Sequence, residues 1–406
     1  MSSADVIVVG AGPAGVAAAV TLAEAGREVV VVDKARFPRD KICGDGLTAG
    51  ALRLLERLGL DPGAVASWQT VEDVVVRGPA GHEVTFPLPR GQGTYAAVAR
   101  RADLDAALVE RARSAGAKVL DGHACTAVTE NADEVTVTVD GVGELTAGFV
   151  VAADGMWSPV RKHLGLATPG YRGEWHAFRQ YFTDVGPRAA SELIVWFEPD
   201  VLPGYAWSFP LPGNRANVGF GIQRGGKVGV QEMATLWPRL LERPHVRAAL
   251  GDDARPEAPH RAWPIPARID EAVLTATRTL FVGDAATATD PLTGEGIGQA
   301  LLTGVLAAEA IVGHGPAAAA VTGAYAASAR RALVADHRMS MLLVRAVRHR
   351  KGVRIGLRLA GATAWTRRNF GRWLFEDYPR AAVVTPRRWH RGLLTGAGAY
   401  RDRVGG

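Results

Sequence analysis

Three glycines within six residues, Gly10, Gly12 and Gly15, follow directly on the short apolar run Asp5–Val9. Such a run is typical of a buried parallel strand. The first glycine permits a tight turn, the second lets a pyrophosphate approach the backbone, and the third lets the next helix pack on the strand. We expect this helix over Pro13–Ala25, with its free N-terminal amides directed at phosphate oxygens. The pattern therefore predicts a strand, turn and helix that bind a dinucleotide.

A second apolar strand, Glu28–Val32, ends at Asp33, eighteen residues after Gly15. An acidic residue at about this spacing hydrogen-bonds a ribose hydroxyl in dinucleotide-binding folds. The simplest alternative is a glycine-rich turn without a ligand, but strand, helix, second strand and acid occur together here, which favours binding. The dinucleotide contacts predicted in this segment are Gly10, Gly12, Pro13, Ala14, Gly15, Asp33 and Lys34.

Two further patches fit the same ligand, although they lie far along the chain. Asp154 follows the predicted strand Phe149–Ala153, and Asp284 follows the predicted strand Thr279–Val282. We expect Asp284 to hydrogen-bond a ribityl hydroxyl, with an N-cap role in the local turn as the alternative. The amides that begin a helix over Gly296–Val312 are expected to face the pyrimidine edge of an isoalloxazine. The patches together predict FAD, with contacts from Asp154, Gly283, Asp284, Pro291, Gly294, Gly296 and Ile297.

The composition disfavours several other classes of protein. With 406 residues, 48% of them hydrophobic and 22% charged, the chain is expected to form two or three globular units. No signal peptide or clean run of about eighteen apolar residues is visible, so we expect a cytoplasmic protein without a membrane-spanning helix. Cys43 and Cys125 are the only cysteines, which excludes a disulfide framework and, in the absence of an HExxH motif, predicts no metal site.

Charge is distributed unevenly along the chain. From Arg330 to Gly406 there are eighteen Lys and Arg residues against four Asp and Glu, a net charge of +14. Because the whole chain has a net charge of +6, the first 329 residues have a net charge of −8. Apolar and aromatic residues such as Leu342, Trp365 and Trp373 are interleaved with these basic residues. Two interpretations remain open: a solvated helical cap on the main domain, or a basic amphipathic surface in peripheral contact with an anionic membrane. Nucleic-acid binding is disfavoured because no known module accompanies the charge.

The order of predicted elements interleaves two kinds of sheet. Alternating apolar segments between residues 177 and 223 predict an antiparallel sheet, whereas the strands before the dinucleotide contacts predict a parallel one. We therefore expect an α/β protein, α+β overall, in which a Rossmann-like FAD-binding domain is interleaved with an antiparallel-sheet substrate domain and followed by a basic helical C-terminal region. The predicted divisions are 1–70, 96–165 and 272–330 for the FAD-binding domain, 71–95 and 166–271 for the substrate domain, and 331–406 for the C-terminal region. The remaining predicted elements are the hairpins Val71–Arg77 with Glu83–Leu88 and Val135–Val139 with Glu144–Ala147, the helix Asp103–Ala115, and the strands Lys118–Leu120, Ala177–Thr183, Glu192–Phe197, Tyr205–Leu211 and Ala216–Ile222.

Three segments give the sequence a resemblance to a known family. They are FPRDKICGDGLT at Phe37–Thr48, PGYAWSFPLP at Pro203–Pro212 and DPLTGEGI at Asp290–Ile297. With the glycine-rich start, they make the chain from about residue 4 to 325 resemble the geranylgeranyl reductase family of FAD-dependent oxidoreductases, within the p-hydroxybenzoate hydroxylase-like fold. The chain departs from the family pattern at Ala49–Gly50, where Pro and Arg are usual, and at Asp290, where Asn is usual. The resemblance also implies that Arg101 contacts FAD.

Members of that family reduce carbon–carbon double bonds in polyprenyl chains, which implies hydride transfer from the reduced flavin. NAD(P)H or another electron donor is expected to bind only transiently, because no second glycine-rich dinucleotide motif is present. Cys43 and Asp45 are the candidate catalytic residues, and Cys43 is also a candidate flavin contact, with a small apolar filler as its alternative role. We expect the substrate to lie in an apolar tunnel on one face of the predicted antiparallel sheet, lined by Tyr181, Trp196, Tyr205, Trp207 and Phe209. The alternative is that this face of the sheet is ordinary hydrophobic core.

Two other functions remain in view. The same fold supports FAD-dependent monooxygenases of aromatic or polyketide substrates, but these usually show GGQGMN where this chain shows TGEGIGQ. A prenyl-lipid carrier without flavin chemistry is the non-enzyme alternative, and the complete phosphate and ribityl signatures argue against it. The sequence thus favours an FAD-dependent reductase with a hydrophobic small-molecule or lipid substrate, no nucleic-acid partner, and a cytoplasmic location with or without peripheral membrane contact.

Overall fold

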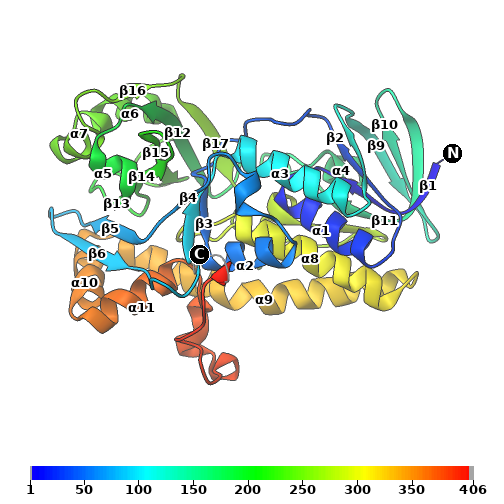
Figure 1. Cartoon of the computed structure of the whole chain (residues 1–406). Coiled ribbons are helices and arrows are strands. Elements are labelled where there is room, and N and C mark those ends of the chain that lie inside the picture. Colours follow the sequence, from blue (N-terminus) through cyan, green and yellow to red (C-terminus); the bar gives the residue numbers. More distant parts are fainter. Residues whose placement is uncertain (1, 402–406) are drawn as a thin grey trace.

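A computed structural model describes residues 2–401 of the chain, in which two large β-sheets stand side by side above a layer of helices (Figure 1). The first sheet has five parallel strands in the order β8–β2–β1–β11–β18, and it continues antiparallel from β11 into β10 and β9. Its central strands are valine-rich, and Val6–Val9, Val29–Val32 and Phe149–Ala152 are buried, as expected for a parallel sheet that is covered on both faces. The strands are β1 Ser2–Val9, β2 Val29–Asp33, β8 Lys118–Asp121, β9 Cys125–Glu130, β10 Val135–Val139, β11 Gly143–Ala152 and β18 Thr279–Phe281.

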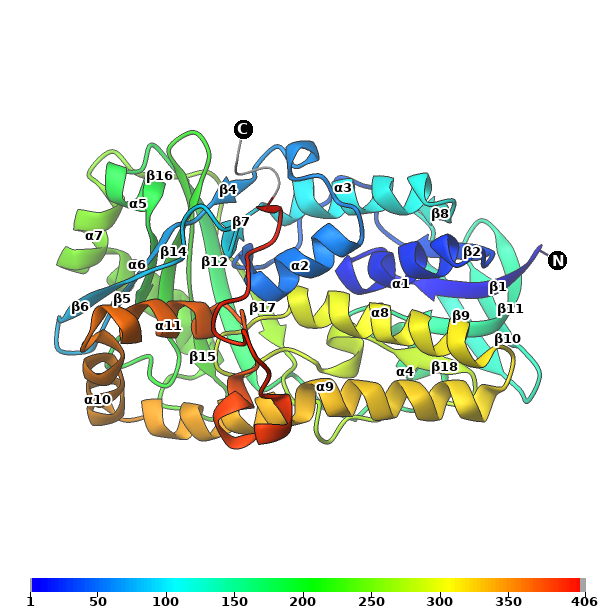
Figure 2. The same cartoon turned by 60° about the horizontal axis from the view of Figure 1, so that its bottom comes forward.

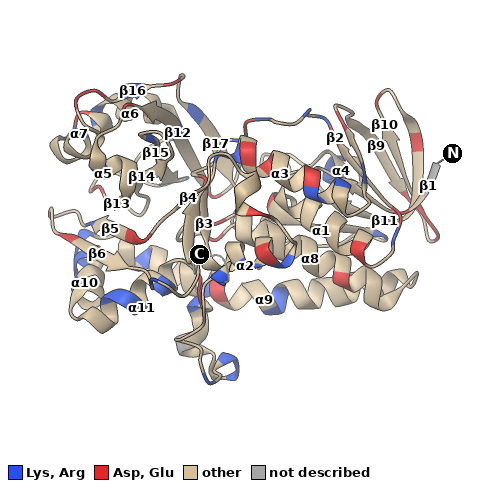
Figure 3. Ribbon diagram, in the orientation of Figure 1, with Lys and Arg blue, Asp and Glu red and all other residues tan. Residues whose placement is uncertain are grey.

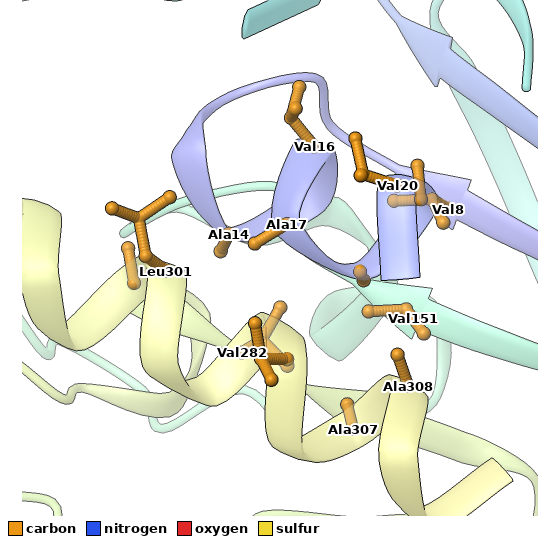
Figure 4. Close-up of a cluster of buried hydrophobic side chains, with 14 of the residues drawn as sticks. Val8, Ala14, Val16, Ala17, Val20, Val151, Val282, Leu301, Ala307 and Ala308 are labelled. Carbon is orange, nitrogen blue, oxygen red and sulfur yellow. The ribbon is translucent and has the colours of Figure 1, made fainter. Parts of the chain in front are cut away.

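Two helices that lie far apart in sequence, α1 (Pro13–Glu24) and α8 (Ile297–His314), pack closely against each other (Figure 4). Their interface uses small residues. A Cβ atom at Gly304 of α8 would lie 2.1 Å from the carbonyl oxygen of Ala14 in α1, so only glycine allows this approach. The packing holds the start of α8 beside the glycine-rich turn. The other helices around the first sheet are α2 Ala49–Arg57, α3 Arg101–Ser114, α4 Pro159–His163, η1 Pro62–Ala64 and η3 Gly283–Ala286.

The second sheet is mainly antiparallel, with the order β16–β12–β15–β14–β13–β5–β6 and with β17 also paired to β12. Side chains on successive residues point to opposite faces. One face packs on α6 (Met233–Leu241) and α7 (Pro244–Leu250) around Phe220 and Trp237, and the other face is covered by the C-terminal helices. The strands are β5 Asp73–Arg77, β6 Glu83–Pro87, β12 Trp175–Thr183, β13 Leu193–Trp196, β14 Ala206–Leu211, β15 Arg215–Gln223, β16 Arg255–Pro256 and β17 Arg261–Ile265, and the remaining short helices of this part are α5 Pro187–Ser191 and η2 Val230–Glu232.

A long helix, α9 (Ala318–Val347), runs under both parts of the molecule (Figure 2). At a rise of about 1.5 Å per residue it extends for about 45 Å. Near its start Tyr325 donates a hydrogen bond to the Phe281 carbonyl of β18, and near its end Val344 packs with Trp175 of β12. The chain then turns back beneath β5 and β6. The elements beyond α9 are α10 Arg350–Gly361, α11 Ala364–Leu374, η4 Arg380–Val384 and η5 Pro386–Arg388, and a small third sheet between the large ones contains β3 Gly46–Thr48, β4 Gln69–Thr70 and β7 Ala96–Val98.

The predicted fold class is confirmed, with two corrections of detail. The predicted strands Glu144–Ala147 and Phe149–Ala153 are one continuous strand, β11, because β1 begins at Ser2 and supplies a partner for the first half as well. Gly148 between them does not interrupt the pairing. The hairpin strand predicted from Val71 begins at Asp73, because the amide of Val71 instead donates to Ala96 in the third sheet.

Helix α8 is the most apolar of the long helices. Of the helices in residues 2–401, it alone is long and apolar enough to cross a membrane by length and composition. Gln299, Thr303 and Glu309 interrupt it, so it is not the clean apolar run that the sequence was expected to lack. In the structure 56% of α8 is buried, and it packs against α1 and α9 as a core helix does.

Candidate active site

One cavity of about 780 Å³ lies where the two large sheets and the C-terminal helices meet, within the size range of small-molecule sites. The glycine-rich turn and the ends of β1, β2 and β11 form its first wall. The inner face of the second sheet forms a second wall, and α9, α10 and α11 form a third. Ends of parallel strands are the usual ligand site of such sheets. The three distant sequence patches therefore converge on one space.

The glycine-rich turn has the shape that a close phosphate contact needs. Gly10 adopts φ 105°, and a Cβ atom on Gly15 would lie 1.8 Å from the Gly10 carbonyl oxygen, so both positions require glycine. Gly12 is different. A Cβ atom there would meet nothing nearer than Arg39 at 3.6 Å, which leaves open space above the N-terminus of α1. Because no side chain caps this helix end, its first amides remain free for an anion.

Asp33 at the end of β2 is fixed by two backbone amides. The Ala11 amide donates to its Oδ2 at 2.7 Å, and the Ala35 amide donates to its Oδ1 at 2.8 Å. The first bond ties the acid directly to the glycine-rich turn. Asp33 and the neighbouring Lys34 both line the cavity, beside the position that the turn leaves for a dinucleotide.

Asp154 and Asp284 follow two adjacent strands of the first sheet and both line the cavity. The Val160 amide donates to Asp154 Oδ2 at 2.9 Å, whereas Asp154 Oδ1 is buried without a hydrogen-bond partner. Burial raises the pKa of Asp154 to about 6. A buried carboxylate oxygen with no partner is costly unless a ligand satisfies it, which fits a polar group of a cofactor at this point.

The loop Asp290–Gly296 is held rigidly in front of α8. Asp290 Oδ1 accepts hydrogen bonds from the Leu292 and Thr293 amides at 3.0 and 2.9 Å, and its Oδ2 accepts one from Ser340 of α9 at 2.5 Å. Glu295 Oε1 accepts the amide of Gly298, so Glu295 anchors the first turn of the helix. The predicted contacts that line the cavity here are Gly283, Pro291, Gly294, Gly296 and Ile297.

Arg101 enters the cavity from the start of α3. Its guanidinium donates two hydrogen bonds of 2.8 Å to Asp105, one turn later, in a bidentate arrangement. Asp105 is fully buried and also pairs with Arg39 at 2.9 Å. The carboxylate therefore fixes two cations beside the cavity, Arg101 and Arg39, where an anionic ligand is expected.

Cys43 and Asp45 lie on the cavity wall in a loop held by the second sheet. Asp45 is wholly buried with φ 66°, and its Oδ2 accepts hydrogen bonds from Tyr181 at 2.7 Å and Asn217 at 2.8 Å. Asn217 also donates to the Cys43 carbonyl at 2.9 Å. Burial raises the pKa of Asp45 to about 6 and also raises the pKa of the Cys43 thiol, which therefore stays protonated at neutral pH.

Three of the five aromatic residues predicted to line a substrate tunnel do line the cavity. Tyr205, Trp207 and Phe209 alternate along one face of the β14 segment, and the ring of Phe209 packs over the loop that carries Cys43. Trp196 does not reach the cavity, because on β13 it points to the opposite face and is buried against α6 and α7. Tyr181 does not line the cavity either. The guanidinium carbons of Arg100 and Arg179 each lie 4.0 Å from the centroid of its ring, and its hydroxyl donates a hydrogen bond to Asp45.

Several residues that line the cavity or hold its walls were missed from the sequence. Lys41 lies 3.9 Å from the centroid of Trp263, and burial lowers the pKa of Lys41 although Asp284 opposes the change. Asn217 interrupts an apolar strand, which was the one visible signal of a buried polar role. The C-terminal residues that line the cavity gave no such signal, because a helix pattern does not say which cavity its apolar face closes. They are Leu343, Val347, Gly352, Val353, Gly356, Leu357, Phe370, Trp373, Leu374 and Phe375.

A parallel sheet with this turn, an acid after β2 and further acids at the ends of β11 and β18, joined to a second sheet across one cavity, defines an FAD-dependent oxidoreductase fold. The family described as "FAD binding domain" matches residues 3–337, and the chain belongs to this family. The predicted resemblance to geranylgeranyl reductases is also confirmed by the relatives. Residues 338–406 lie outside the family match.

The relatives are named reductases. The chain is 36% identical over 326 residues to a menaquinone reductase of Mycobacterium tuberculosis, covering 76% of each chain. It is 35% identical over 317 residues to digeranylgeranylglycerophospholipid reductase 1 of Methanopyrus kandleri, covering 76% of this chain and 80% of that one. A crystal structure of a geranylgeranyl bacteriochlorophyll reductase-like protein from Thermoplasma acidophilum superposes with a TM-score of 0.80 at 20% identity, over 96% of this chain and 100% of that one.

Proposed function

We propose that this enzyme reduces carbon–carbon double bonds in the polyprenyl chain of a lipid or quinone. One observation carries the proposal: a continuous row of aromatic rings leads away from the Cys43–Asp45 loop. Neighbouring ring centroids along the row Phe209, Trp207, Tyr205 and Phe197 are 6.0, 6.1 and 6.1 Å apart. Such a surface suits a long apolar chain rather than a compact aromatic ring. The names of the two bacterial and archaeal relatives both describe molecules that carry prenyl chains.

The chemistry divides between cofactor and protein. When bound and reduced, FAD supplies a hydride to one carbon of the double bond. The other carbon needs a proton, and in this proposal Cys43 holds it, because its thiol is neutral and faces the cavity. Arg101 lies near Cys43 and opposes the rise in the thiol pKa that burial causes. Asp45, with a pKa of about 6, exchanges protons near neutral pH and is suited to reload the thiol.

The residues predicted to hold FAD keep that role in the proposal. The free amides above Gly12 and the cations Arg39 and Arg101 are suited to the pyrophosphate, while Asp33 is suited to the ribose. Asp284 faces the cavity where a ribityl hydroxyl is expected. The reductant of the flavin is proposed to be NAD(P)H or another donor that binds transiently.

The C-terminal region is proposed to rest on an anionic membrane surface, which would bring a lipid substrate to the enzyme. On the outer side of α10, Ile355 and Leu359 are 55% and 68% exposed, beside the basic Arg354 and Arg358. Trp365 at the start of α11 is 58% exposed (Figure 3 shows the basic residues of both helices). Exposed apolar side chains among cations are typical of peripheral membrane contact. Leu359→Glu is expected to lower co-sedimentation with phosphatidylserine vesicles at low salt, and unchanged co-sedimentation would count against this contact.

The reaction is tested by mixing enzyme carrying chemically reduced FAD with a geranylgeranyl lipid without oxygen. Re-oxidation of the flavin, followed by its absorbance, is expected only when the lipid has double bonds. The matched control is the fully saturated lipid of the same length. A lipid that gains an oxygen atom only when oxygen is admitted would instead favour a monooxygenase, and a lipid that binds but is recovered unchanged under both conditions would favour a carrier.

A further inference from the structure

The cavity extends away from the Cys43–Asp45 loop beneath successive strands of the second sheet. Its lining passes from Trp207 on β14 to Val195 on β13 and then to Val76 on β5, which are neighbouring strands in the sheet. The distance across the sheet from β14 to β5 is two inter-strand spacings, or roughly 10 Å. The cavity is therefore elongated across the strands, and its β5 end lies farthest from the loop.

The β5 end is closed by residues of α10 and α11. Leu357 of α10 packs against the end of β5 so closely that a Cβ atom on Gly78 would lie 2.8 Å from its Cδ1. The ring of Phe370 in α11 lies 4.7 Å from the ring of Phe86 in β6, centroid to centroid. Both Leu357 and Phe370 line the cavity.

These two helices are firmly placed on the sheet rather than loosely apposed. A Cβ atom on Gly361, at the end of α10, would lie 3.1 Å from the side chain of Val84. At the end of α11, Arg372 is paired with Asp377, which also accepts a hydrogen bond from Arg53 of α2. A closed end that is anchored in this way has a fixed position, so the space it leaves for a ligand has a fixed length.

The geometry points to Leu357 and Phe370 as the residues that set the length of prenyl chain this enzyme accepts. This inference rests on the proposed function, since it assigns the remote end of the same cavity. Both residues lie in the C-terminal region, outside residues 3–337, the part that matches the family. A chain longer than the cavity must clash with Leu357, and a shorter one leaves apolar surface uncovered.

The matched control lies on the same helix. Leu359 is two residues after Leu357 but is 68% exposed, whereas Leu357 is 5% exposed. Leu357→Ala and Leu359→Ala therefore make the same chemical change on opposite faces of α10. Phe370→Leu opens the same end of the cavity with a smaller loss of packing, and serves if Leu357→Ala lowers the thermal stability too far.

The experiment measures binding of fully saturated prenyl alcohols of increasing length to the FAD-loaded enzyme, from changes in the flavin absorbance spectrum. Saturated chains cannot be reduced, so the readout does not depend on turnover. Leu357→Ala and Phe370→Leu are expected to shift the length preference toward longer chains by about tenfold or more in relative affinity, since single methylenes discriminate on this scale in apolar pockets. Leu359→Ala is expected to keep the wild-type profile.

Two contrary results are distinguishable. A wild-type length preference that Leu357→Ala and Phe370→Leu leave unchanged would overturn the length assignment alone. Failure of the wild-type enzyme to bind any saturated chain would contradict the proposed function and, with it, the assignment.

Discussion

Asn217 donates a hydrogen bond to the buried carboxylate of Asp45 across 2.8 Å. The same side chain donates to the Cys43 carbonyl at 2.9 Å and accepts one from Trp207 at 3.1 Å. One residue of β15 therefore fixes the loop of both candidate catalytic residues and one ring of the aromatic row. The loop belongs to the first half of the chain, yet the second sheet sets its position.

Asn217→Ala is expected to destabilise the protein by about 1–3 kcal/mol, because it leaves a buried carboxylate with one partner fewer. Chemical denaturation measures the change. The control is Ser208→Ala on the neighbouring β14, where the hydroxyl is buried without a hydrogen-bond partner, so its loss is expected to cost almost nothing. Equal stability of the two variants would show that Asn217 does not hold the loop.

Gly12→Ala and Gly15→Ala separate the binding role of the turn from its structural role. An alanine at position 12 meets only ordinary contacts, so we expect a folded protein within about 1 kcal/mol of wild type. Its Cβ would intrude on the pyrophosphate, so FAD affinity is expected to fall roughly tenfold to hundredfold. Gly15→Ala is expected to disrupt folding, because the new Cβ would overlap the Gly10 carbonyl. Calorimetry with FAD and thermal melts measure both, and full FAD affinity in Gly12→Ala would refute this placement.

Asp284→Ala is expected to weaken FAD binding by roughly tenfold to hundredfold, since a carboxylate hydrogen bond contributes about 1.5–3 kcal/mol. The ratio of flavin to protein absorbance after gel filtration gives the occupancy. Asp253→Ala, at an exposed position outside the cavity lining, is the control and is expected to retain full occupancy. Purification of Asp284→Ala with a complete flavin complement would remove Asp284 from the site.

The raised pKa of Asp45 predicts a definite pH dependence of stability. Its pKa is about 6 in the folded protein, because of burial, and about 4 in an unfolded chain. Between these values the folded state binds the proton more tightly, so its free energy of unfolding falls as pH rises from about 4 to about 6 and is level above that range. Asp45→Asn lacks this contribution. The free energy of unfolding of wild type minus that of Asp45→Asn should therefore fall by up to about 3 kcal/mol as the pH rises through that window, and a constant difference would disprove the shift.

The parts of the site that follow from local backbone requirements were predictable. Gly10 and Gly15 predict the tight turn between strand and helix, and the spacing from Gly15 predicts Asp33 as the acidic residue. In the structure Asp33 is hydrogen-bonded to that turn. It was harder to predict which side of a sheet the side chains of a strand would face. Trp196 and Trp207 are both aromatic residues in alternating strands, but only the register against neighbouring strands decides that Trp207 lines the cavity and Trp196 the core.

The C-terminal wall was not predictable at all. The sequence showed basic helices with apolar residues, and two interpretations, a cap or a membrane surface, were open. In the structure α10 has both kinds of face: Leu357 closes the cavity, whereas Leu359 is exposed among cations. Leu357 and Leu359 are only two positions apart on the helix, so only the tertiary packing shows which of them faces the cavity and which faces solvent.

The mass of the product shows whether this enzyme reduces prenyl double bonds. A polyprenyl lipid is incubated with the FAD-loaded enzyme and dithionite in the absence of oxygen, and the lipid is then analysed by mass spectrometry. We expect the lipid to gain two hydrogen atoms for each double bond reduced, and to gain none in reactions that lack enzyme. A lipid whose mass is unchanged without oxygen, but which gains an oxygen atom when air and NADPH are supplied, would show a monooxygenase instead of a reductase.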